Sequence, residues 1–261
     1  MGIDIQTITQ LRNQTGAGIA DCKNALEEAG GDITKAVEIL RKRGEIKAAK
    51  KADRTTNEGL VAIIKDGQKA SAVVLACETD FVSRNEDFIS AVSGYAQKLL
   101  TTPEADFKNW AEENIKTDLV LKIGENIKLG DFGVIEGNVL GTYLHSNKKV
   151  GAVVALTGGS LELANDIAMQ IVAMSPKYVS SENVSMAEKE KEKEIYREQM
   201  KNENKPAEII EKIILGKLNK YYEDVCLLNQ PFIKDDSKKI SDLLKEAGEG
   251  IAIKEFRKFS V

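Results

Sequence analysis

The sequence predicts an α+β protein with a three-helix N-terminal module, a duplicated β-β-α core with antiparallel sheets, and a helical-hairpin arm. Three observations favour this fold class. Apolar residues recur at helical spacing from Ile5 to Gly44, and two β-β-α patterns follow at an offset of 80 residues. A highly charged, helix-forming stretch then lies at about residues 182–225. We therefore expect an N-terminal module with a basic linker, a first core subdomain, and a second core subdomain that includes the arm. These parts correspond to residues 1–55, 56–137 and 138–261.

The composition is that of an ordinary soluble protein, and its charge favours a protein partner. The chain has 261 residues, of which 42% are hydrophobic and 30% are charged. The formal net charge is −4, so bulk attraction to nucleic acid or to an anionic membrane is not expected. Three cysteines lie far apart without a Cys-x-x-Cys pair, which disfavours a disulfide framework and a zinc site. With no apolar stretch near the roughly 18 residues of a membrane span and no leader pattern, we expect a cytoplasmic protein.

The N-terminal module is predicted from three apolar stripes separated by glycine-containing breaks. Thr15–Gly18 ends the first helix, and Gly30–Asp32 supplies a C-cap glycine followed by an N-cap aspartate. The basic, alanine-rich segment Lys42–Arg54 is interpreted as a linker with helical tendency. It could contact ribosomal RNA, but a charge run is usually a solvated helix face, so nucleic acid is the less favoured partner. The stripes comprise Ile5, Ile8 and Leu11, then Ile19, Cys22, Ala25 and Leu26, then Ile33, Ala36, Val37 and Leu40.

Each core copy is predicted to be a β-hairpin followed by a helix. The first hairpin turns at an Asp-Gly pair, Asp66-Gly67, which is a strong hairpin signal. Ala72-Val73-Val74 matches Ala152-Val153-Val154 at the offset of 80, which indicates an internal duplication. The predicted segments are strands 59–64 and 70–75 with a helix at about 87–100, and strands 139–144 and 151–156 with a helix near 161–174.

The segments outside the two copies are predicted to be mainly helical. Two charged helices interrupted at Asn202–Pro206 are expected to pack antiparallel as the arm. The remaining predictions are a mainly helical segment over 102–126, strand and loop over 122–127 and 129–136, helix over 240–247 and strand over 251–259.

The first copy ends in an unusual corner, where a carboxylate and an aromatic ring follow a buried strand. One interpretation is that Phe81 folds back into its own core while Asp80 ends the strand. The other is that both side chains reach a partner, because such corners commonly carry function. The second copy has Thr157-Gly158-Gly159-Ser160 there, without an aromatic residue, so the shared fold does not require an Asp-Phe pair. This difference favours the functional interpretation.

The inventory of reactive residues favours a binding protein over an enzyme. His145 is the single histidine, which excludes a two-histidine metal site, and we expect neither a metal nor a cofactor. A Cys77/His145 nucleophile pair lacks any supporting local signature. No Gly-x-x-x-x-Gly-Lys-Ser/Thr motif and no Gly-x-Gly-x-x-Gly motif after a strand occurs, so direct nucleotide binding is not expected.

Seven motifs in order resemble the bacterial translation elongation factor Ts family along nearly the whole chain. Among them, Thr79-Asp80-Phe81-Val82 would be weak alone, but the ordered set is specific. The other six are Thr15–Gly18 with Asp21–Leu26, Gly31-Asp32, Ala48–Lys51, Lys122–Asn126, Gly141–His145 and Gln230–Phe232.

The resemblance implies a non-enzymatic guanine nucleotide exchange factor that acts on elongation factor Tu in translation elongation. It also implies that the N-terminal module is ubiquitin-associated-like and that the arm is a coiled coil. In the family, the aromatic residue of the corner wedges between helices of the GTPase, and the motif is linked to displacement of the magnesium ion. Here Asp80 and Phe81, flanked by Thr79 and Val82, occupy those positions, and the resemblance implies that all four residues belong to the partner-binding motif.

Further contacts with the same partner follow from the resemblance. Arg12 and Ile19 are expected in the contact made by the N-terminal module, and His145 in the contact made by the second core copy. Relatives commonly continue with a glycine-rich turn and a final helix that contacts elongation factor Tu. Because this sequence stops at Val261, we expect either that this contact is absent or that the chain is shortened.

Three rival hypotheses remain open at this point. The first is a structural or adaptor protein in which Asp80-Phe81 is internal. The second is an RNA-binding factor that uses Lys42–Arg54, and the third is a cysteine hydrolase that uses Cys77.

Overall fold

The computed structural model describes residues 3–201 and 206–261. The chain folds into two compact units. The first comprises the chain up to Val134 together with Ser146–Val150 and Phe259–Val261, and the second comprises Ile135–His145 and Gly151–Lys258. Helices accompany antiparallel hairpins, so the predicted α+β class is confirmed. The division into residues 1–55, 56–137 and 138–261 stays a prediction.

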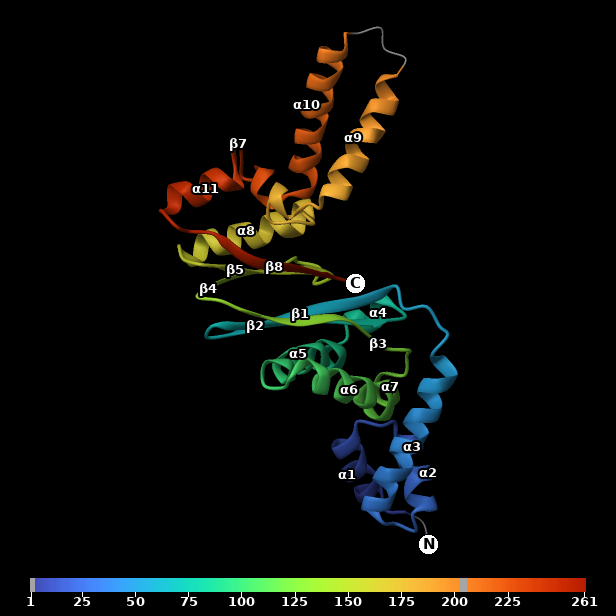
Figure 1. Ribbon diagram of the computed structural model, residues 1–261. Coiled ribbons are helices and arrows are strands. Elements are labelled where there is room, and N and C mark those ends of the chain that lie inside the picture. The colour runs from blue at the N-terminus through green and yellow to red at the C-terminus, as the bar shows by residue number, and fades with distance from the viewer. Residues whose placement is uncertain (1–2, 202–205) are drawn as a thin grey trace. The chain divides into compact units, whose positions relative to one another are not determined.

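The first unit begins with three helices, α1 (Ile5–Thr15), α2 (Ile19–Glu28) and α3 (Ile33–Lys51), as predicted (Figure 1). Gly16 ends α1 with φ +66°, and the side chain of Asp32 accepts a hydrogen bond from the N–H of Lys35. The three apolar faces pack together and also enclose a residue from a later helix. The buried residues are Leu11, Ala17, Cys22, Ala25, Leu26, Ala36, Leu40 and Leu121.

The basic segment Lys42–Arg54 is not a linker over most of its length, because α3 continues without interruption to Lys51. Gly44 does not break this helix. It lies inside α3, where a Cβ atom would come within 2.8 Å of the carbonyl oxygen of Thr117. The glycine is therefore explained by close packing of helix against helix, a tertiary effect that overrides its low helix propensity.

The first unit contains a sheet of strand order β1-β2-β3, with β1 at Glu58–Asp66, β2 at Lys69–Cys77 and β3 at Lys128–Glu136. Gly67, with φ +55°, makes the tight turn of the predicted hairpin. Helices on one face cover the apolar side of the sheet (Figure 1), where Val73 and Leu75 of β2 pack in one core with Phe88 of the long helix that follows. These helices are α4 (Asp80–Ser83), α5 (Glu86–Leu100), α6 (Glu104–Asn114) and α7 (Val120–Ile123), with a π-helical turn at Ile115–Leu119 between the last two.

The second unit contains most of a sheet of order β4-β5-β8, with β4 at Val139–Leu144, β5 at Val150–Leu156 and β8 at Ile253–Ser260. Helix α8 (Leu161–Met174) packs directly on β4 (Figure 1). A Cβ atom at Gly141 would lie only 2.1 Å from backbone atoms of Ala164, so this close approach requires glycine. The remaining elements are β6 (Pro231–Phe232), β7 (Asp235–Lys239), α11 (Ile240–Ala247) and 3₁₀ turns at Ser181–Asn183 and Leu227–Asn229.

Strand pairing supports the predicted duplication. Leu60 lies opposite Leu75 in the first hairpin, and Leu140 lies opposite Ala155 in the second. Adding 80 to both numbers of the first pair gives the second pair, and the same shift relates every other pair of the second hairpin to one of the first. Because a slip of one residue would turn every side chain to the other face, the shared register preserves the same buried face in both copies.

Helices α9 (Met186–Met200) and α10 (Ala207–Val225) pack against each other, as predicted for the arm (Figure 1). At their base, the hydroxyl groups of Tyr178 and Tyr221 donate hydrogen bonds of 2.6 and 2.5 Å to the carboxylate of Glu188. The predicted break at Asn202–Pro206 lies outside the described residues except for Pro206, which immediately precedes α10. The coiled-coil character of the pair stays a prediction.

Candidate functional site

The corner after β2 is a single helical turn, α4, with a threonine cap. Thr79 has extended backbone angles, φ −126° and ψ 157°, and its hydroxyl accepts a hydrogen bond of 3.4 Å from the N–H of Val82. The hydroxyl of Ser83 donates a bond of 3.0 Å to the carbonyl of Asp80. Threonine followed by a short helix is typical of an N-cap, and this cap fixes the position at which Asp80 and Phe81 leave the sheet.

Phe81 points away from the protein, with 82% of its surface exposed. The interpretation in which this ring folds back into its own core is therefore wrong. Val82 does pack against the first core, so the turn is anchored on one side and presents the ring on the other. Fully burying such a ring in a partner would contribute roughly 1.5–3 kcal/mol, which makes it a candidate contact residue.

Asp80 lies beside the exposed ring and is paired within its own turn. Its carboxylate is 3.0 Å from the guanidinium of Arg84, and the side chain of Asp80 remains 46% exposed. A negative charge and an aromatic ring are thus presented together at one corner of the first unit.

A second segment, Gly124–Asn126, which is distant in the sequence, forms hydrogen bonds with the corner. One carboxylate oxygen of Glu125 accepts the backbone N–H groups of Glu78 and Thr79, each at 3.0 Å. The other oxygen accepts the hydroxyl of Thr79 at 2.6 Å. In return, the carboxylate of Glu78 accepts the backbone N–H of Asn126 at 2.6 Å. We refer to this reciprocal set of bonds between Glu78-Thr79 and Glu125-Asn126 as the corner clamp.

The corner clamp is also connected to the end of α3. The side chain of Asn126 donates a hydrogen bond of 2.8 Å to the carbonyl of Arg54, and the guanidinium of Arg54 lies 3.3 Å from Glu78. The ammonium group of Lys51 donates to the carbonyl of Gly124. The hydrogen bond from the backbone N–H of Asn126 and the positive charge of Arg54 hold the pKa of the Glu78 carboxyl below its usual value. Glu78 therefore stays ionised and bonded at neutral pH.

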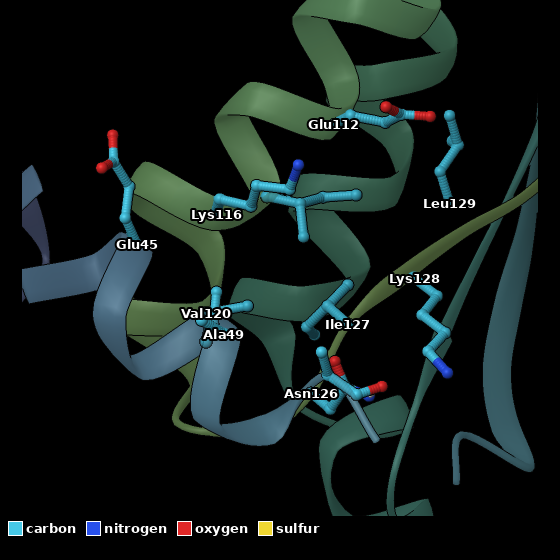
Figure 2. Close-up of a pocket in the computed structure, with 12 residues that line it drawn as sticks. Glu45, Ala49, Glu112, Lys116, Val120, Asn126, Ile127, Lys128 and Leu129 are labelled. Carbon is cyan, nitrogen blue, oxygen red and sulfur yellow. The ribbon is translucent and has the colours of Figure 1, made fainter. Parts of the chain in front are cut away.

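A pocket of about 540 Å³ lies beside the corner clamp (Figure 2). The buried apolar residues Ile115, Val120 and Ile127 line it. Glu45 and Lys116 lie at its rim (Figure 2). Asn126 is the residue that the pocket shares with the corner clamp. None of the four predicted corner residues lines this pocket.

The other two predicted contact residues of the first unit lie near the break between α1 and α2. Arg12 is exposed near the end of α1, and Ile19 begins α2 with 58% of its surface exposed. Between them, Gly16 lies against the side chain of Lys122, which pairs with Asp87 at 3.7 Å. In the described part of the chain, no hydrogen bond or ion pair joins Arg12 or Ile19 directly to the corner.

His145 lies in the second unit, immediately after β4. It is exposed, and its Nδ1 atom is 3.3 Å from the hydroxyl of Tyr143. An exposed histidine at this position is able to contact a partner. The contact between His145 and Tyr143 does not pair the histidine with a cysteine nucleophile. Within residues 3–201 and 206–261, no group of three or more His, Cys, Asp or Glu residues is arranged to hold a metal ion.

Comparisons with known proteins identify the family. The family model described as Elongation factor TS matches residues 78–261, a segment that begins at the corner. A protein named elongation factor Ts from Aquifex aeolicus is 40% identical over 285 residues, which span 100% of this chain and 98% of the relative. Elongation factor Ts proteins from Hahella chejuensis and Hydrogenobaculum sp. are 42% and 41% identical, over 94% and 100% of this chain and 88% and 99% of their own lengths. The chain belongs to the elongation factor Ts family.

The family resemblance predicted from the motifs is thereby confirmed. The sequence did not, however, lead to a prediction of the corner clamp in this member of the elongation factor Ts family. Glu125 lies in the quoted segment Lys122–Asn126, yet no role was predicted for it. The one available signal was a Gly-Glu-Asn sequence directly after a helical pattern, since Gly124 ends α7 in the left-handed conformation. The contact between Glu125 and Thr79 spans 46 residues, so local sequence does not reveal it.

Proposed function

We propose that the protein is a guanine nucleotide exchange factor for elongation factor Tu and promotes GDP release so that GTP can bind. The supporting observation is the exposed ring of Phe81 beside Asp80, on a turn held by the corner clamp, in a member of the elongation factor Ts family. The ring would enter the GTPase and disturb its magnesium and phosphate contacts. In this proposal, Thr79 and Val82 hold the turn, while Asp80 and Phe81 meet the partner.

The physical basis of exchange is linkage between two ligands of the GTPase. A partner that binds the conformation lacking phosphate and magnesium contacts must lower the affinity for GDP, and GDP lowers the affinity for the partner by the same factor. Each 1.4 kcal/mol of coupling corresponds to about tenfold in affinity. Burial of Phe81 supplies roughly 1.5–3 kcal/mol before costs, so a larger effect requires other contacts.

Those further contacts are proposed at Arg12 and Ile19 in the first unit and at His145 in the second. All three side chains are exposed, as contact residues must be in the free protein. The finer assignments of a ubiquitin-associated-like module for α1–α3, a coiled-coil arm for α9 and α10, and a cytoplasmic location are part of the same proposal.

The proposal involves no covalent catalysis by this chain. Burial raises the pKa of the Cys77 thiol to about 12, with the charge of Glu125 contributing to the rise, so the thiolate is scarce at neutral pH. Exchange by differential binding needs neither a nucleophile nor a cofactor of the chain's own. None of the helices in the described ranges has the length and apolar character required to cross a membrane.

RNA binding by the basic segment Lys42–Arg54 is the less favoured function, because several of its cations already have partners in the chain. Arg43 pairs with Glu28 at 2.7 Å, and Lys47 pairs with Asp21 at 2.9 Å. Breaking these pairs would offset part of any gain from phosphate contacts.

The test is the release of labelled GDP from elongation factor Tu at several concentrations of this protein. We expect the wild type to accelerate release and Phe81→Ala to lower the maximal rate by about tenfold or more. The matched control is Leu161→Ala. Leu161 is 53% exposed and occupies the position of Phe81 in the second copy, at the offset of 80 residues. Equal release rates for wild type and Phe81→Ala would contradict the proposed role of the corner.

A further inference from the structure

Glu125 contacts the corner at Glu78 and Thr79, directly before the short helix α4. Its carboxylate accepts the N–H groups of Glu78 and Thr79, both at 3.0 Å, and the Thr79 hydroxyl at 2.6 Å. Helix α4 has only four residues, which is too short for a helix to be stable by itself. The direction of Phe81 must therefore be fixed by contacts from outside the turn.

Thr79 connects Glu125 with the helical turn. Its hydroxyl donates to Glu125 and accepts from the N–H of Val82 at 3.4 Å. A hydroxyl whose hydrogen is committed to one acceptor directs its lone pairs elsewhere, here toward the N–H of the third residue of α4. Glu125 thus orients the cap, and the cap orients the turn that carries Phe81.

Both neighbours of Glu125 along the chain are held in place by hydrogen bonds. Gly124 ends α7 with φ +86°, and its carbonyl accepts the ammonium group of Lys51 from the end of α3. The next residue, Asn126, donates its N–H to Glu78 at 2.6 Å and its side chain to the carbonyl of Arg54 at 2.8 Å. The backbone around Glu125 is therefore fixed, and the carboxylate of Glu125 holds the exposed turn at a defined position relative to it.

We propose that Glu125 is a positioning residue for nucleotide exchange, which acts through Phe81 by holding the turn Asp80–Ser83 in the orientation that a partner recognises. The inference rests on the proposed exchange function. It assigns a role to a side chain that does not itself have to touch the partner. Loss of the carboxylate removes the acceptor for three donors, two of which belong to the backbone of the corner.

The first test uses the free protein and does not depend on exchange activity. Amide hydrogen exchange is measured for Val82, Ser83 and Arg84, whose N–H groups bond within the corner and not to Glu125. We expect Glu125→Ala to accelerate their exchange by about tenfold. Glu125→Gln should retain most of the protection, because its amide oxygen can still accept the two backbone N–H groups. Unchanged exchange at these three amides in Glu125→Ala would overturn the proposal.

Glu104→Ala is the matched control. The carboxylate of Glu104 also accepts a backbone N–H in the first unit, from Val134 at 3.0 Å, but it has no contact with the corner clamp among the described hydrogen bonds. Faster exchange at Val82–Arg84 in this variant as well would indicate general loosening and would contradict a specific role for Glu125. If Glu125→Ala does not fold, Glu125→Asp provides the same test, because its shorter side chain withdraws the carboxylate from the three donors and leaves the cap at Thr79 unchanged.

The second test is a double-mutant cycle in GDP release from elongation factor Tu. We expect Glu125→Ala to lower the maximal rate by about tenfold and Glu125→Gln to restore it largely. In the Phe81→Ala background, Glu125→Ala should cause no further loss, since both changes remove the same oriented ring. Additive losses would overturn the proposed action through Phe81. If Phe81→Ala alone leaves release unchanged, the proposed exchange role of the corner fails, while the hydrogen-exchange test still decides whether Glu125 positions the turn.

Discussion

The carboxylate of Asp80 lies 3.0 Å from the guanidinium of Arg84, one helical turn further along the chain. Both side chains are accessible to water, with 46% and 80% of their surfaces exposed. Exposed pairs at this spacing contribute about 0.3–0.5 kcal/mol, because water screens the charges and both side chains lose freedom. Asp80 can therefore exchange Arg84 for a cation or an N–H donor of a partner at little cost.

Replacement of Arg84 should accordingly leave the stability of the free protein nearly unchanged. We expect Arg84→Ala to change the free energy of unfolding by less than about 0.5 kcal/mol, measured by urea denaturation. A loss above about 1 kcal/mol would show that the pair is part of the folded structure, and that Asp80 is not available to a partner.

Much of the fold was predictable from the sequence because its signals are local. The Asp66-Gly67 turn fixes the first hairpin, and the repeat at an offset of 80 residues predicts the second with the same register. The predicted helix over 240–247 agrees with α11, since its apolar spacing needs no distant contact to be recognised.

The parts that were not predictable depend on contacts between distant segments. In the sequence, Gly44 suggests the end of a helix. In the structure it lies inside α3, because the carbonyl oxygen of Thr117 packs so close to it that a Cβ atom would not fit. At the candidate site, Asp80 and Phe81 were identified from motif and duplication. Glu125 was not assigned a role, because its partner Thr79 lies 46 residues away. Sequence periodicity also could not show on which side of the corner the ring lies.

Gly44 provides a prediction about stability. A Cβ at this position would lie 2.8 and 2.9 Å from the carbonyl oxygens of Thr117 and Lys116, which are backbone atoms and cannot swing aside. We expect Gly44→Ala to lower the free energy of unfolding by about 1–3 kcal/mol, despite the better helix propensity of alanine. Thermal and urea denaturation measure this loss.

Gly94 is the matched control for that substitution. It lies within α5 of the same unit, and a Cβ there would meet nothing within 4 Å. Gly94→Ala should therefore stabilise the protein by about 0.5–1 kcal/mol through helix propensity alone. Stabilisation by both substitutions would mean that α3 does not pack closely against Thr117 in solution.

Glu78 predicts how stability depends on pH. The N–H of Asn126 and the guanidinium of Arg54 lower the pKa of the Glu78 carboxyl from its ordinary value of 4.5. Because the folded pKa lies below the unfolded one, the stabilisation is complete above about pH 4.5 and is lost as the pH falls through the folded pKa. We expect Glu78→Gln to reduce the fall in the free energy of unfolding between about pH 4.5 and pH 3, measured by urea denaturation at each pH. Identical acid slopes for wild type and variant would show that the corner clamp does not depend on this charge.

The cysteines provide the last prediction, because the thiol of Cys77 reports on the corner itself. Burial raises the pKa of Cys77 to about 12 and that of Cys226 to about 11, and it also raises the pKa of Cys22. At pH 8, the thiolate fraction of Cys77 is about a thousandfold below that of a free thiol with a pKa near 8.5. We expect iodoacetamide at about pH 8 to label all three cysteines in guanidinium and none of them at a comparable rate in the native protein, as measured by peptide mass spectrometry.

The thiol of Cys77 also donates a bond of 3.3 Å to the carbonyl of Thr79, so its protection requires the closed corner. Rapid labelling of Cys77 in the native state, with Cys22 still protected, would show that the strand end opens and that the exposed ring of Phe81 is not held in one orientation.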